Sequence, residues 1–244
     1  MSEVEIEHNM IYTNNNDDDG DGVVDADADS GGGYIALEQA YLNYWNGNWG
    51  FKGGVVLVPA GITNEYHEPP TFMSVERPEY NKYVIPTTWF DNGFAFYGNM
   101  SDVNWNFTMT GDLDGDEIGD GIRSARMKGV GSKTSDWTKT LQLSWAGMEG
   151  LKVGGSVTMN DAPRNDVNGA PVDAVGVKLT EVNATWSKNN VYVRMENGKI
   201  DYDNNPSAES TSGHYLDLGY NIADLVGCND KDLYLWTRMS SYNK

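Results

Sequence analysis

The chain has 244 residues, a formal net charge of -19 and three histidines. Nucleic acid and anionic surfaces repel so acidic a body, so nucleic acid is excluded as an expected partner. No apolar run approaches the ~18 residues that a membrane-spanning helix needs, but barrel strands of about 9–11 half-polar residues remain possible.

Eleven short segments have the alternating pattern of β-strands. The clearest runs from 103 to 110, where Val103, Trp105 and Phe107 alternate with polar residues. Near 174–187 the alternation changes phase between Leu179 and Val182, which suggests a β-bulge. The expected strands are 2–13, 33–45, 49–58, 93–99, 103–110, 137–145, 151–160, 174–187, 191–196, 213–222 and 232–240.

The connections between these strands alternate between long and short. This rhythm is typical of bacterial outer-membrane barrels, which have short periplasmic turns and longer extracellular loops. We therefore predict an all-β, antiparallel, up-and-down transmembrane β-barrel in the outer membrane. Trp45, Trp137, Trp145 and Trp186 would lie in its interfacial girdles. The long extracellular loops are expected near 14–32, 59–92, 111–136, 161–173 and 197–212, and short turns near 46–48, 99–102, 147–150 and 188–190.

The predicted number of strands is odd, whereas single-chain bacterial barrels have even numbers. The chain also begins without a leader sequence and ends without a closing aromatic residue. We therefore expect residues 1–244 to form a single partial barrel domain, open along two unpaired edges.

The first long loop contains acidic residues at alternate positions. Asp17, Asp19, Asp21 and Asp25, with Gly22 at the turn, are similar to the calcium loops of EF-hands and thrombospondin type 3 repeats. The EF-hand's bidentate glutamate is missing, and no helix flanks the loop. The residues therefore predict either weak calcium binding or a solvated acidic loop, and no other cofactor is expected.

A second acidic stretch lies in the loop at 111–136 and is followed by a basic segment, 121–128, that we expect to form a helical turn. Folded into a pore, charges of both signs would create a transverse field and set ion preference. Outside a pore they would be ordinary surface charges. The candidates here are Asp116, Glu117, Asp120, Arg123, Arg126 and Lys128.

Enzymatic motifs are missing from the sequence. It has no nucleophile elbow, phosphate loop or HExxH segment, and three histidines offer no catalytic set. We expect no enzyme.

The segments 54–72, 75–78 and 85–89 resemble Gram-negative outer-membrane porins of the phosphate-selective porin O and P type. The resemblance implies a channel of about 16 or 18 strands, commonly a homotrimer, with loops folded into the lumen. It makes the 59–92 loop a second source of constriction residues. These candidates are Glu65, His67, Glu68, Glu76, Arg77 and Lys82.

Phosphate selectivity does not follow, because the polar faces of the strands carry mostly Thr, Asn, Ser and Gln rather than basic residues. We expect a passive channel for ions and small hydrophilic solutes, with outer-membrane lipid around it. The alternative is a secreted soluble β-sandwich or adhesin that attaches through the acidic calcium loop.

Overall fold

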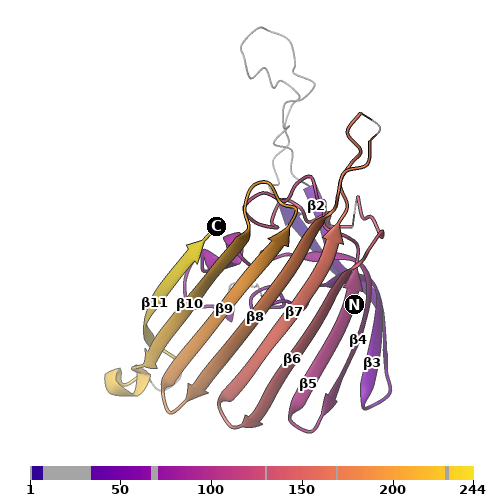
Figure 1. Cartoon of the computed structure of the whole chain (residues 1–244). Helices are drawn as coiled ribbons and strands as arrows, with labels where there is room; N and C mark the ends of the chain where they lie inside the picture. The colour runs from indigo at the N-terminus through magenta and orange to yellow at the C-terminus, as the bar shows by residue number, and fades with distance from the viewer. Residues whose placement is uncertain (1, 8–33, 67–70, 130, 169, 229–230) are drawn as a thin grey trace, which may run out of the picture.

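The computed structural model describes residues 2–7, 34–66, 71–129, 131–168, 170–228 and 231–244. Eleven strands form one sheet in which the spatial order equals the chain order (Figure 1). The strands are β1 (Ser2–Glu7), β2 (Tyr34–Trp45), β3 (Trp49–Leu57), β4 (Phe90–Met100), β5 (Val103–Thr110), β6 (Thr138–Met148), β7 (Leu151–Ala162), β8 (Val175–Lys188), β9 (Val191–Asp203), β10 (Ser210–Asn221) and β11 (Tyr234–Asn243).

Every neighbouring pair of strands is antiparallel, so the predicted all-β, up-and-down fold is confirmed. Among the described residues β1 pairs only with β2, and β11 only with β10, so the sheet is open along both outer strands. A β-sandwich needs two packed sheets. The alternative of a β-sandwich is therefore wrong for the described part of the chain.

The connections separate by length onto the two ends of the sheet (Figure 1). Short turns follow β2, β4, β6 and β8, whereas residues 58–89 and 111–137 form long connections at the opposite end. The predicted long loop at 197–212 is wrong in its bounds, because β9 continues to Asp203 and β10 starts at Ser210. Polar side chains in this stretch imitate a loop, although Ile200 and Tyr202 are buried on the inner face.

The two faces of the sheet have different chemistry. On the inner face Thr108, Thr140 and Thr158 lie side by side across β5, β6 and β7, each about 1% exposed. On the outer face Leu143 and Val182 are 49% and 53% exposed, although they belong to the middle of the sheet. A continuous set of exposed apolar residues extends over the outer face, which we call the outer band. It includes Leu42, Phe96, Val103, Leu141, Leu143, Met159, Val182, Met195, Leu218, Leu235 and Met239.

The predicted bulge in β8 is wrong, because β8 keeps an unbroken register with both β7 and β9. The apolar residues change face instead. Val177 and Leu179 point inward, where the loops cover them, whereas Val182 belongs to the exposed outer band. The first half of β8 therefore packs its apolar residues against the loops and the second half exposes them on the outer band. This change of face alters the alternation pattern without an extra residue in the strand.

The two long connections fold onto the concave inner face and form the hydrophobic core there (Figure 1). The first connection carries the short helix α1 (Tyr80–Tyr83), whose Tyr80 is fully buried and packs against Tyr215 at 5.6 Å between ring centroids. A Cβ on Gly198 of β9 would run into the Tyr80 hydroxyl, so this glycine makes the close approach possible. Burial raises the pKa of Tyr80 well above its usual value.

The second connection adds Leu113, Ile118 and Ile122 to this core. The expected helical turn at 121–128 is wrong, since these residues form bends and turns. The Ala125 carbonyl accepts from the Asp114 N–H, and the Arg126 side chain donates to the Thr88 carbonyl and hydroxyl of the first connection. The remaining described helix is the 3-10 helix η2 (Ala223–Val226), between β10 and β11.

Trp45 departs from the predicted girdle. It stacks on Tyr97 at 5.5 Å, and the Tyr97 hydroxyl donates to Asn43, so Trp45 belongs to an inner-face cluster. Trp145 and Trp186, in contrast, are in register with the outer-face residues Val153 and Val193. No helix in the described part of the chain is long and apolar enough to cross a membrane.

Candidate functional site

Buried carboxylates hold the first long connection against the wall. Glu196 of β9 is fully buried and accepts hydrogen bonds from the Ile62 N–H at 3.3 Å and the Tyr215 hydroxyl at 3.0 Å. Glu181 of β8 accepts from Ser156 at 3.0 Å and from Asn183 at 2.6 Å. The Ile62 N–H therefore ties the first long connection to Glu196, and the neighbouring Gly61 N–H donates to Glu181.

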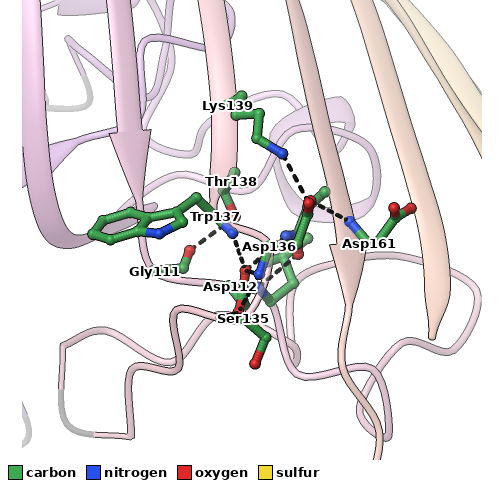
Figure 2. Close-up of polar contacts among 10 residues, drawn as sticks. Gly111, Asp112, Ser135, Asp136, Trp137, Thr138, Lys139 and Asp161 are labelled. Carbon is green, nitrogen blue, oxygen red and sulfur yellow. Dashed lines mark hydrogen bonds and ion pairs between the residues drawn. The ribbon is translucent and has the colours of Figure 1, made fainter. Parts of the chain in front are cut away.

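A second carboxylate anchor holds the connection between β5 and β6, as Figure 2 shows. Asp112 is 1% exposed and accepts from the N–H groups of Ser135 and Trp137, both at 2.6 Å. It also accepts from the Asn160 side chain of β7 at 2.9 Å. One side chain thus joins the start of the connection, its end and the neighbouring strand.

Asp136, next to this anchor, connects the end of the connection to β6 and β7 (Figure 2). It accepts from the Lys139 ammonium at 2.8 Å and from the Asp161 N–H at 2.9 Å. Burial raises the pKa of Asp136, but these hydrogen bonds and the Lys139 charge outweigh it, so the pKa is lowered overall. The carboxylate therefore stays ionised, and its contribution to stability is lost only as the pH falls through this lowered pKa.

A cavity of about 440 Å³ opens between the two long connections, Ser207 of the β9–β10 connection and Lys244 after β11. We call it the mouth cavity. It brings together five of the predicted candidates, from both connections. Its charged lining residues are Lys82, Asp116, Glu117, Asp120, Arg123 and Lys244.

A neighbouring cavity of about 370 Å³ shares Lys82 and Arg123 with the mouth cavity and adds Glu76 and Arg77. Arg77 donates to the Thr87 hydroxyl at 2.6 Å. Seven predicted candidates therefore gather around two adjoining cavities. The sequence separation between the two connections hid this proximity.

The other candidates have different positions. Glu65 accepts from Gln142 of β6 at 2.8 Å, away from the mouth cavity. Arg126 does not face open space, because it donates to the Thr88 carbonyl and hydroxyl, both at 3.0 Å. Lys128 lies in a turn with φ of 51° and lines neither cavity. The remaining candidates fall outside the described residues: His67, Glu68, Asp17, Asp19, Asp21 and Asp25.

Sequence reasoning missed Glu181, Glu196 and Lys244. Glu181 and Glu196 lie in alternating strands and have no local signal that distinguishes an anchor from a lumen-facing acid. Lys244 enters through its ion pair with Asp120 at 2.7 Å, which only the folded chain brings about. Among the residues that the structure describes, no three His, Cys, Asp or Glu side chains are placed to hold a metal ion.

Comparisons with known proteins support the fold. No protein-family model matches the chain. An uncharacterized protein of Aquifex aeolicus (strain VF5) is 36% identical over 120 residues, which are 48% of this chain and 23% of that protein. The solved structure of the anion-selective porin from Comamonas acidovorans is similar with a TM-score of 0.52 and 9% identity, over 86% of this chain and 57% of the porin.

The likeness at 9% identity concerns the fold alone: the chain has the up-and-down antiparallel sheet of a porin-type wall. The chain spans less than two thirds of the length of either matched protein. The phosphate-selective family is not identified by these comparisons.

Proposed function

We propose that the chain forms part of the wall of an outer-membrane channel for passive diffusion of ions and small hydrophilic solutes. The outer band carries this proposal. Exposed Leu143, Val182 and Met195 would be unfavourable in water but stable against lipid, whereas the opposite face carries the polar threonine row in place of such an apolar band.

The dimensions of the outer band support a membrane position. On β7 its residues run from Leu151 to Met159. At about 3.4 Å per residue and a tilt of about 40°, this stretch spans roughly 20 Å along a barrel axis, close to the ~25 Å apolar band of outer-membrane barrels. Farther along β9 the outward residues are Asn197, Lys199 and Asp201, which suit the aqueous side.

The open edges of β1 and β11 imply that further strands complete the wall, because hydrocarbon cannot satisfy unpaired backbone groups. A barrel of about 16 or 18 strands would provide them. Similarity to a longer porin fits this proposal, which also includes assembly into homotrimers in the outer membrane.

The two long connections would narrow the lumen, because both pack on the inner face and carry charges of both signs. A general or weakly selective pore suits this arrangement better than phosphate selectivity, since acids and bases occur together. Liposome swelling tests this function. Liposomes loaded with the completed barrel should swell in small sugars and progressively less in larger ones; swelling no faster than in protein-free liposomes would refute passive diffusion.

A charge in the outer band should prevent stable insertion. Leu143→Arg places a guanidinium among exposed apolar residues, whose cost at the bilayer midplane is about 2–4 kcal/mol. Ser144→Arg is the matched control, because Ser144 faces inward. Urea unfolding from liposomes should show that Leu143→Arg lowers the unfolding free energy by this amount, whereas Ser144→Arg lowers it by less than about 1 kcal/mol. Equal losses of unfolding free energy in the two variants would argue against a lipid-facing band.

Charge reversal in the mouth cavity should change ion preference. Arg123 is exposed and lines both cavities, so Arg123→Glu should shift reversal potentials in bilayers toward cation preference. Arg126→Glu should instead reduce stability, because Arg126 holds the backbone at Thr88. An unchanged reversal potential for Arg123→Glu would place this cavity outside the conduction path.

A further inference from the structure

The mouth cavity has balanced charges, although the whole chain is strongly acidic. Three acidic and three basic side chains line it, so their formal charges cancel. A surface of net zero charge favours neither anions nor cations as a whole. The three acids are Asp116, Glu117 and Asp120, and the three bases are Lys82, Arg123 and Lys244.

Some of these charges already have partners. Asp116 lies 3.5 Å from the Arg164 guanidinium and accepts from Asn165, and Asp120 pairs with Lys244. Lys82, Glu117 and Arg123 are exposed and have no ion pair in the described part of the chain. The cavity therefore offers two cations and one carboxylate to a solute.

The free groups come from both long connections. Lys82 is on α1, where its ammonium lies over the Tyr83 ring at 5.2 Å from the centroid. Glu117 and Arg123 belong to the second connection, whose chain between them is fixed by the buried Ile118 and Ile122. This packing fixes the backbone positions from which the two side chains extend into the cavity.

We propose that the mouth cavity is a binding subsite for small zwitterions of the amino-acid and dipeptide type. The solute's carboxylate binds at Lys82 and Arg123, and its ammonium group binds at Glu117. A solute with a single charge binds either the two cations or the carboxylate and leaves the other group without a partner. The volume of about 440 Å³ lies within the ~300–1,000 Å³ of small-molecule sites.

This subsite deepens the proposed function, since the channel would bring solutes to the cavity. Binding itself needs no conduction, so the two proposals can fail separately. Absence of conductance would refute the channel, whereas a conducting protein without zwitterion preference would refute only the subsite.

The test measures binding to the completed, detergent-folded barrel by isothermal titration calorimetry. Three probes that share the glycylglycine backbone separate the charges: glycylglycine carries both, N-acetylglycylglycine only the carboxylate, and glycylglycine amide only the ammonium. Because exposed ion pairs are weak, we expect glycylglycine to bind about fivefold more tightly than either of the others. Equal affinities for all three probes would overturn the proposal.

Variants assign the two ends of the solute. Glu117→Gln should make glycylglycine bind no better than N-acetylglycylglycine, and Lys82→Gln with Arg123→Gln should make it bind no better than the amide. Glu209→Gln, an exposed carboxylate that does not line the cavity, is the control and should keep the preference. Far-UV circular dichroism checks that each variant is folded; a folded Glu117→Gln protein with the full preference would overturn the assignment.

Discussion

Asp112→Ala should unfold at much lower urea concentration than the unchanged chain, with a loss of about 3–4 kcal/mol in unfolding free energy. The substitution removes the acceptor for the N–H groups of Ser135 and Trp137 and for the Asn160 side chain (Figure 2). Buried donors without an acceptor cost about 1–3 kcal/mol each, reduced where water enters. Urea unfolding in detergent micelles measures the difference.

Asp161→Ala is the matched control for this measurement. Asp161 is exposed and contributes its backbone N–H, not its carboxylate, to the same network. The unfolding free energy of Asp161→Ala should fall by no more than about 0.5 kcal/mol. If Asp112→Ala and Asp161→Ala were equally stable, the carboxylate would not be the anchor of the second connection.

Gly61→Ala should release the first long connection from the wall and increase single-channel conductance. Gly61 has φ of 68°, a conformation that costs an alanine about 1–2 kcal/mol. A Cβ there would also run into the Glu196 carboxylate, which accepts from the neighbouring Ile62 N–H. Both effects act on the same anchor, so the loop should leave the lumen wall rather than adjust locally.

The control for the loop is Gly119→Ala. Gly119 lies in the second connection and has open space around its Cα, so a methyl group there meets nothing within 4 Å. Limited proteolysis should cut residues 58–89 faster in Gly61→Ala alone, and bilayer recordings should show larger conductance steps for that variant. Wild-type conductance together with wild-type protease resistance would show that Glu196 does not hold the loop.

Much of the strand arrangement follows from local sequence. Alternation of Val103, Trp105 and Phe107 with polar residues defines β5 directly, because a strand between lipid-like and polar surroundings needs a period of two. The same logic fails in β8, where Leu179 faces the loop core and Val182 faces outward. A phase change in apolar residues cannot reveal by itself whether the backbone bulges or the environment changes.

The candidate site was predictable only in part. Acidic and basic residues in the second connection pointed to Glu117 and Arg123, which do line one cavity. Arg126 carries the same guanidinium as Arg123 and belongs to the same basic segment, but its contacts with Thr88 make it a structural anchor. Whether an arginine lines the cavity or anchors the loop depends on which backbone carbonyls of the first connection lie within its reach. Long-range packing of the two connections decides this.

The most direct test of the proposed function is planar-bilayer recording of the folded, detergent-purified barrel that these strands complete together with the proposed further strands. If the inner face lines an aqueous channel, the current should rise in discrete, uniform steps, with larger steps for Gly61→Ala and altered ion preference for Arg123→Glu. Folded protein that inserts into the bilayer without producing discrete steps would contradict the account.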